Sequence, residues 1–206
     1  WTNHNKQKIL DSRVKYSKGL LKAASSMKIN HYIQASAITY YPFSSSRKFI
    51  ESMGKQKGSN FSLKLVQDWE SVVNKSSIKN NTILRLGVVM GQKSKFLEPI
   101  KSLFNLYLGG MIGDGKQWVS WIHIDDLASM FVHAVEQELE GVYNAVTSKP
   151  QTNEEITKLI ANLYNTRIRL PNIPKFALRL LLGEMADVVL DSQMVSNEKI
   201  ATTGFK

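Results

Sequence analysis

The sequence predicts an α/β fold built around a parallel sheet. The segment Thr82–Met90 (TILRLGVVM) is a nearly continuous apolar run that ends at Gly91, as is typical of a strand buried on both faces. An earlier segment, His31–Ala37, is short and rich in strand formers, and a helix is expected between the two, over Asn60–Asn74. Strand, helix and strand in this order is the rhythm of a βαβ architecture. We therefore expect His31–Ala37 and Thr82–Met90 to be neighbouring parallel strands.

The chain opens with a polar, lysine-rich stretch, about Asn5 to Met27, that predicts a surface helix. The net charge of +10 permits binding to nucleic acid or to an anionic small molecule. The basic residues are nevertheless scattered, and five lysines recur at the spacing of a solvated helix face: Lys6, Lys8, Lys15, Lys18 and Lys22. No RNA-binding aromatic signature or zinc-finger spacing accompanies them, so a nucleic-acid-binding module rests on charge alone.

Composition excludes several classes of protein. The 206 residues suffice for one domain or for one domain with a small appendage. The chain has no cysteine, which excludes disulfides, zinc-thiolate sites and cysteine nucleophiles. No apolar run approaches the roughly 20 residues that a membrane-spanning helix needs. We expect a soluble, cytoplasmic protein, although organellar targeting stays open because the chain opens in what looks like the middle of a domain.

The second half of the chain predicts smaller, mixed elements. Trp118–Ile124 (WVSWIHI) is expected to be a short strand, and Asp125 and Asp126 stand where the next helix would start, since acidic groups favour a helix N-terminus. Thr152 and Glu155 have the spacing of a capping box. The other expected elements are a polar loop at Ser44–Ser46, a helix at Phe96–Leu108, a turn at Gly113–Gly115, a strand at 142–146, and an apolar helix at Phe176–Leu182 with short helices after it.

Four stretches in the same order carry a resemblance to a known family: Ala35–Tyr41 (ASAITYY), Leu84–Gly91 (LRLGVVMG), Gly113–Leu127 (GDGKQWVSWIHIDDL) and Leu178–Gln193 (LRLLLGEMADVVLDSQ). Together they resemble extended short-chain dehydrogenases/reductases, in the subgroup of NAD-dependent epimerase/dehydratase proteins of unassigned substrate, similar to nucleotide-sugar epimerases. The resemblance covers essentially the whole chain and begins well inside the usual family sequence.

The resemblance implies the C-terminal part of a Rossmann-type parallel sheet, followed by a small mixed α/β substrate domain. We expect residues 1–91 to belong to the dinucleotide-binding domain and residues 92–206 to belong mostly to the substrate domain. The implied cofactor is NADP or NAD, and the implied partner is a small-molecule substrate, for which a nucleotide sugar is the candidate. A homodimer is also a candidate, and neither nucleic acid nor a membrane is expected.

The resemblance also implies which residues form the catalytic site. Ser36 would lie at the carboxyl end of a strand, where open α/β sheets place their ligands, and would contact both cofactor and substrate. Its alternative role is to satisfy the backbone at the strand end. Tyr40 and Tyr41 follow closely and are the candidates for a proton donor, with packing at a loop edge as the alternative.

The cofactor and substrate candidates lie further along the chain. The loop after the second strand would pass the nicotinamide, which makes Arg85, Gly87, Val88 and Val89 the expected cofactor neighbours. Arg85 stands inside an apolar run, so we expect a carboxylate or a carbonyl to pair with it. The expected substrate-binding group is Gln117, Trp118, Trp121 and His123, among which alternation lets Trp121 and His123 share a face.

Two departures from the family pattern bear on activity. None of the twelve glycines forms the GxGxxG or GxxGxxG loop that cradles a pyrophosphate, so that loop would lie upstream of Trp1. The catalytic tyrosine–lysine pair is also missing. Counting back from Glu70, the lysine position is Val66 and the tyrosine position is Ser62, or Phe61 after a one-residue slip. Enzyme activity is therefore left open, and a cofactor-binding sensor of the same fold is the rival hypothesis.

Overall fold

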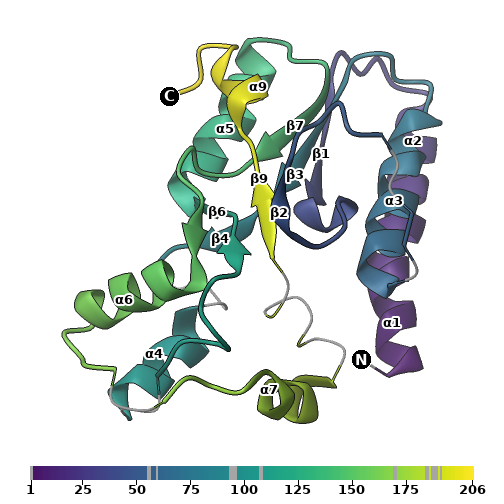
Figure 1. The fold of residues 1–206 in the computed structure, drawn as a ribbon. Coiled ribbons are helices and arrows are strands. Elements are labelled where there is room, and N and C mark those ends of the chain that lie inside the picture. The colour runs from purple at the N-terminus through teal and green to yellow at the C-terminus, as the bar shows by residue number, and fades with distance from the viewer. Residues whose placement is uncertain are drawn as a thin grey trace.

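The computed structural model describes residues 2–54, 57–58, 60–92, 97–106, 109–168, 171–183, 186, 190 and 192–206. Its centre is a parallel sheet in the order β1 (Tyr32–Ala37), β3 (Asn81–Leu86), β7 (Gly141–Ala145) (Figure 1). The expectation that the segments near His31–Ala37 and Thr82–Met90 form neighbouring parallel strands is confirmed for β1 and β3. The division at Gly91 stays a prediction, and β7 joins this sheet from beyond that point.

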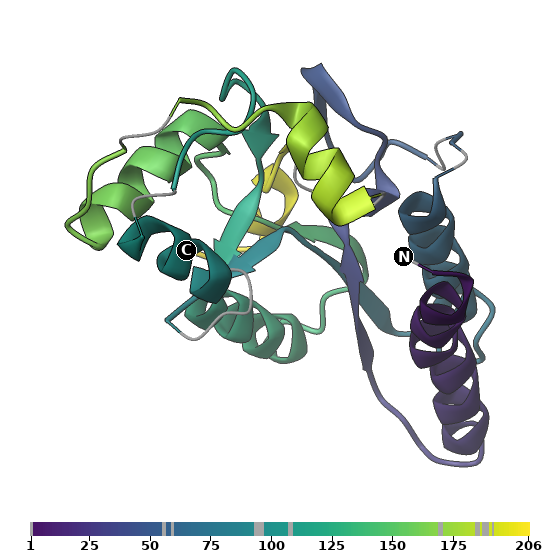
Figure 2. The ribbon, with the colours of Figure 1, turned by 90° about the horizontal axis from the view of Figure 1, so that it is seen from below.

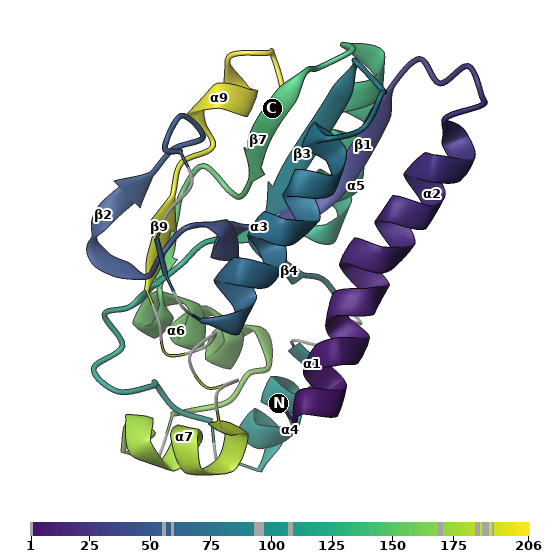
Figure 3. The ribbon, with the colours of Figure 1, turned by 90° about the vertical axis from the view of Figure 1, so that its right-hand side faces the viewer.

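Helices cover both faces of the central sheet, which gives three layers (Figure 3). On one face lies α3 (Phe61–Asn74), whose N-cap Asn60 accepts a hydrogen bond from the Leu63 amide. Outside α3 runs a continuous helical rod composed of α1 (Asn3–Leu10), the π-helical segment η1 (Asp11–Lys15) and α2 (Tyr16–Ala24). The opposite face is covered by α5 (Ile124–Glu136), which buries Leu127, Met130 and Ala134 against the strands.

The expected single strand Thr82–Met90 is wrong, because the chain changes sheets at Gly87. β3 ends at Leu86, and β4 (Val88–Met90) pairs instead with β6 (Trp121–His123). The Gly87 amide still bonds the Ala145 carbonyl, whereas the next amide, of Val88, bonds the Ser120 carbonyl. A Cβ on Gly87 would lie 2.5 Å from that carbonyl oxygen. A side chain at Gly87 would therefore force the two ladders apart.

The expected strand Trp118–Ile124 is also broken, at Ser120. Its first part, β5 (Trp118–Val119), pairs antiparallel with β8 (Gln151–Thr152), and the second part is β6. The Ser120 hydroxyl occupies the break, donating to the Gln193 carbonyl (2.8 Å) and accepting from the Val195 amide (3.0 Å). Ile124 already belongs to α5, whose N-cap is His123.

A further correction concerns Ser44–Ser46, expected as a loop. These residues begin β2 (Ser44–Phe49), which pairs in parallel with β9 (Gln193–Val195), in a tail for which only helices were expected. Single-chain alternation could not reveal this pair, because the two strands are short and nearly 150 residues apart. After β9 the chain ends in a short helix, α9 (Glu198–Ala201).

Three helices lie beyond the central sheet at the lower end of the molecule: α4 (Leu97–Asn105), α6 (Asn153–Leu163) and α7 (Lys175–Leu182) (Figures 1 and 2). The capping box expected at Thr152 and Glu155 opens α6. Two ends of the helix expected at 96–108, Phe96 and Leu108, lie outside the described residues. Among the helices that the structure describes, none is long and apolar enough to cross a membrane.

Candidate functional site

Three polar residues stand side by side on the face of the central sheet that meets α3. In the parallel register, Ser36 lies opposite Arg85, and Arg85 lies opposite Asn144. Aligned residues of neighbouring strands point to the same face of a sheet. All three are buried. We call this set the polar row.

Glu70 of α3 holds the first half of the polar row. Its carboxylate accepts hydrogen bonds from Arg85 Nε (2.9 Å) and Nη2 (2.8 Å), and from the Ser36 hydroxyl (2.6 Å). The expected partner of Arg85 is thus a bidentate carboxylate. Burial alone would lower the pKa of Arg85, but the hydrogen bonds and the charge of Glu70 raise it above its usual range. Arg85 therefore stays charged.

Tyr41 holds the second half of the polar row. Its hydroxyl accepts from Arg85 Nη1 (2.9 Å) and donates to Asn144 Oδ1 (2.9 Å). The Asn144 side chain donates to the Ser196 carbonyl, and its backbone amide donates to Glu51. Burial raises the pKa of Tyr41 above the usual value of a tyrosine, an effect that the neighbouring Arg85 opposes. The hydroxyl of Tyr41 thus has a partner in each hydrogen-bonding direction.

Tyr40 differs from its neighbour, because it is only half-buried and its hydroxyl has no hydrogen-bond partner in the part of the chain that the structure describes. The guanidinium carbon of Arg85 lies 3.4 Å from the centre of the Tyr40 ring, a cation–π stack. The two tyrosine rings meet edge to face, with centroids 5.7 Å apart. Tyr40 therefore presents an unengaged phenol beside the carboxyl ends of β1 and β3.

The structure thus separates the three catalytic candidates. The Ser36 hydroxyl is buried and donates to Glu70, and the Tyr41 hydroxyl is bonded to Arg85 and Asn144 of the polar row. The alternative role of Ser36 was to satisfy the backbone at the strand end, whereas its hydroxyl donates to the Glu70 carboxylate. Catalysis by Ser36, Tyr41 or Tyr40 stays a prediction; the hydroxyls of Ser36 and Tyr41 are engaged, whereas that of Tyr40 has no partner among the described residues.

The expected cofactor neighbours all lie at the switch between β3 and β4. The Arg85 side chain is already bonded to Glu70 and Tyr41. The close approach of the Ser120 carbonyl explains why a glycine stands at position 87. The Val88 and Val89 side chains pack against different apolar clusters. Gly87, Val88 and Val89 are partly exposed, and contact with a cofactor stays a prediction for this segment.

Three members of the expected substrate group lie on two small ladders, Trp118 on β5–β8 and Trp121 and His123 on β4–β6, and Gln117 directly precedes β5. The buried amide of Gln117 donates to the Ile112 carbonyl, while its Oε1 has no partner in the described region. Trp121 packs in the cluster around Met90 and Phe104. The backbone amide of Trp118 donates to the distant Ser192 hydroxyl, and the His123 ring caps α5. Contact with a substrate stays a prediction for all four.

The positions of the missing tyrosine–lysine pair lie on α3. Val66 is buried at the lysine position, and Ser62 and Phe61 are half-buried at the two tyrosine positions. Lys64 is exposed. No phenol or amine of α3 therefore replaces the pair in the described part of this helix.

Several members of the site were not singled out from the sequence: Glu51, Ser120, Asn144 and Gln193. Asn144 carries a signal that could have found it, because it interrupts the apolar run VYNAV as Arg85 interrupts TILRLGVVM. Two polar residues inside neighbouring buried strands predict that the two meet. Gln193 carries no such signal, since its partners are backbone carbonyls.

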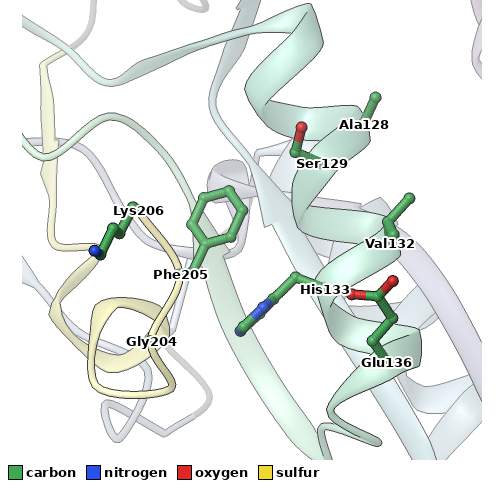
Figure 4. A pocket seen from close by; sticks show the side chains of 8 residues that line it. All are labelled: Ala128, Ser129, Val132, His133, Glu136, Gly204, Phe205 and Lys206. Carbon is green, nitrogen blue, oxygen red and sulfur yellow. The ribbon is translucent and has the colours of Figure 1, made fainter.

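A separate cavity of about 470 Å³ lies on the far side of α5, against the end of the chain (Figure 4). It is lined by residues of that helix and of the last turn: Ala128, Ser129, Val132, His133, Glu136, Gly204, Phe205 and Lys206. The His133 ring bonds Thr203 and packs on Phe205. None of the expected site residues lines this cavity.

Comparison with known families gives two matches. A family described as the NAD dependent epimerase/dehydratase family matches residues 1–146. A domain of unknown function, DUF1731, matches residues 173–206. An epimerase family protein of Staphylococcus saprophyticus is 31% identical over 211 residues, with 100% of this chain and 70% of that protein aligned. One from Mycobacterium leprae is 32% identical, with 91% of this chain and 61% of that protein aligned.

Solved structures agree with the sequence comparisons. A human epimerase family protein with NADPH has a TM-score of 0.93 and 27% identity, covering all of this chain and 71% of the human one. A nucleoside-diphosphate sugar epimerase from Corynebacterium glutamicum has a TM-score of 0.78 and 26% identity, with 41% of its chain covered. A UDP-glucuronic acid 4-epimerase from Bacillus cereus, at 16% identity, shows the fold alone. The expected Rossmann-type sheet is confirmed.

Proposed function

The chain belongs to the NAD-dependent epimerase/dehydratase family, and from this premise we propose that it is part of an NAD(P)-dependent, epimerase-like enzyme. Its substrate would be a small molecule with a hydroxyl or carbonyl group, and a nucleotide sugar is the candidate class. The NADPH of the human relative and the name of the corynebacterial one support this proposal. NADPH is accordingly the cofactor to test first, with NADH beside it.

The residues present fit the nicotinamide side of such a cofactor and not its pyrophosphate. When bound, the cofactor supplies hydride transfer. The carboxyl ends of β1 and β3, where doubly wound sheets bind ligands, carry the turn with Tyr40 and the backbone at Gly87 to Val89. A glycine loop for the phosphates is absent from the sequence. We therefore expect this chain alone to bind NADPH weakly or not at all, and micromolar saturable binding in a fluorescence titration would contradict this.

The observation that carries the proposal is the free phenol of Tyr40 over Arg85. A hydroxyl being oxidised must lose a proton, and a carbonyl being reduced must gain one. Ser36 and Tyr41 already use their hydroxyls inside the polar row. Tyr40 alone among the three combines partial exposure, an unpartnered hydroxyl and a neighbouring fixed cation. We assign proton transfer to Tyr40.

The test compares turnover by matched tyrosine and serine variants. A chimera would carry the N-terminal part of the staphylococcal relative ahead of Trp1, so that a glycine loop is present. Turnover of nucleotide sugars and small carbonyl compounds should fall by a factor of about 100 in Tyr40→Phe, the scale of general acid–base catalysis. Ser36→Ala and Tyr41→Phe should act through stability instead. Undiminished turnover in Tyr40→Phe would show that another group moves the proton.

A second function is favoured by one specific observation, the replacement of the tyrosine–lysine pair by Ser62 and Val66. A protein of this fold without that pair could bind a dinucleotide and report its redox state through a partner. Complete silence of the chimera across the substrate panel, with NADPH still bound, would place this sensor function first.

A further inference from the structure

The turn that carries Tyr40 depends on one buried amide. The 3₁₀ turn η2 (Ile38–Tyr40) follows β1 directly, and the Tyr41 amide closes its end by donating to the Ile38 carbonyl. Gln193 Nε2 donates to that same Ile38 carbonyl (3.3 Å) and to the Tyr41 carbonyl (2.7 Å). Gln193 is 6% exposed. One side-chain amide thus uses its two hydrogens to hold both ends of the turn.

The backbone of Gln193 is itself fixed. Its carbonyl accepts from the Ser120 hydroxyl, and its strand β9 pairs with β2. The Ser120 carbonyl in turn accepts from the Val88 amide. A continuous chain of contacts therefore runs from the tyrosine turn through Gln193 and Ser120 to the β4 strand. The chain links the turn to the segment expected to face the nicotinamide.

The two tyrosines at the turn are held by different contacts. Tyr41 is held twice, by its carbonyl through Gln193 and by its hydroxyl through Arg85 and Asn144. Tyr40 has ring contacts with Arg85 and Tyr41 and packs against the apolar cluster around Phe49, and its hydroxyl is unpartnered among the described residues. No hydrogen bond in the described region therefore holds the Tyr40 phenol, and its place depends on this packing and on the backbone of the turn, which Gln193 fixes.

We infer that Gln193 is a positioning residue, which sets where the Tyr40 phenol stands relative to the β4 strand. This inference rests on the proposed function only for its effect on turnover. Methionine has nearly the length of glutamine but no donor, so Gln193→Met leaves both carbonyls without their partner. Glutamate would place a carboxylate against the same two carbonyls, and Gln193→Glu is expected to act in the same direction and more strongly.

The control is Gln34→Met. Gln34 is also buried, at 3% exposure, and its amide donates to a backbone carbonyl, that of Trp69. It lies toward the other end of β1, away from the turn. Gln34→Met loses one amide–carbonyl bond and Gln193→Met loses two, so a merely structural role predicts a loss of stability in both variants and no effect confined to the turn. Only the Gln193 variants should change the environment of Tyr40.

The first readout is independent of activity and uses the chain itself. Nitration by tetranitromethane, mapped by mass spectrometry, should proceed several-fold faster at Tyr40 in Gln193→Met than in the wild type. Hydrogen exchange in peptides covering 37–43 should also accelerate. Gln34→Met should leave both unchanged, and Tyr16, which is 68% exposed, is the internal standard for nitration. Wild-type nitration and exchange at the turn in Gln193→Met would overturn the inference.

The second readout uses the chimera with its glycine loop. Where the wild type turns a substrate over, Gln193→Met should lower kcat by up to about 100-fold, the cost of misplacing a reacting group by an ångström, with the KM for NADPH unchanged. A shifted Tyr40 with unchanged kcat would refute proton transfer by Tyr40 and leave the positioning in place. Loss of NADPH binding together with kcat would refute the positioning role.

Discussion

The two faces of the central sheet are built from the same three strands but by opposite means. The face toward α3 carries the polar row, in which Arg85 is bound to a carboxylate and to a phenol. The face toward α5 is apolar, with Leu84, Tyr143 and Ala145 packed against Met130 of the helix. Alternation along each strand places these two sets on opposite faces. One face therefore depends on the pairing of polar groups, and the other on the filling of volume.

The largest effect is expected on the polar face, from Arg85→Met. This change leaves the Glu70 carboxylate buried without its cation, and losing one partner of a buried pair costs about 4 kcal/mol. Urea unfolding followed by circular dichroism measures the loss. The double variant Glu70→Leu/Arg85→Met removes the uncompensated charge and should recover most of the stability. A double variant as unstable as the single one would show that the pairing itself is not what matters.

On the apolar face, Met130→Ala should cost about 3 kcal/mol, through the lost burial and the cavity left behind. Met130 is 1% exposed, so the surrounding side chains have little freedom to refill the space. Met130→Leu, which keeps the volume, should be nearly neutral in the same urea experiment. Equal losses in the two variants would mean that this face senses shape rather than volume.

A smaller effect on the polar face is expected from Tyr41→Phe, about 1.5 kcal/mol near neutral pH, because Arg85 and Asn144 each lose a partner. The sign of the pH dependence follows from the raised pKa of Tyr41, caused first by burial. Its stabilising contribution is complete below the unfolded pKa, near 10, and is lost as the pH rises above it. The unfolding free energies of wild type and variant should therefore converge above pH 10. A constant difference there would contradict this explanation.

The smallest effect tests whether burial is what makes the Arg85 pair strong. The exposed pair Glu154–Lys158 has a comparable separation, 2.6 Å, at i and i+4 on α6. Lys158→Met should cost only about 0.3 kcal/mol, and raising the salt concentration should abolish the difference. A loss here as large as that of Arg85→Met would remove the distinction between the surface pair and the buried pair.

The parts of the fold that the sequence predicted are those with a local signal. Asn60 and Thr152 are residue types that cap helices, and they stand at the starts of α3 and α6. The apolar composition of two segments predicts β1 and β3. The breaks at Gly87 and Ser120 could not be predicted, because each marks a change of pairing partner within an otherwise regular strand pattern. What decides them is the approach of a second ladder from a distant part of the chain.

The site was predictable to a similar degree. The cost of burying a charge predicted that Arg85 has a partner. The partner is Glu70, the residue from which the positions of the missing tyrosine–lysine pair were counted. The roles of Ser36 and Tyr41 were harder, because strand alternation does not tell which face of the sheet meets a substrate. The role of Gln193 could not be predicted, because a glutamine that donates to two backbone carbonyls leaves no pattern in the sequence.

The bond between Gln193 and the Tyr41 carbonyl also has a consequence for biosynthesis. Its two residues are 152 positions apart. At ribosomal elongation rates of about 5–20 residues per second, the glutamine is made on the order of ten seconds after the tyrosine. During that interval β1 and β3 can already pair, but the turn at Ile38–Tyr40 has no restraint from the tail. A strand made long after the sheet therefore completes the site, and a nascent chain stopped before β9 would hold β1 and β3 with its tyrosine turn unanchored.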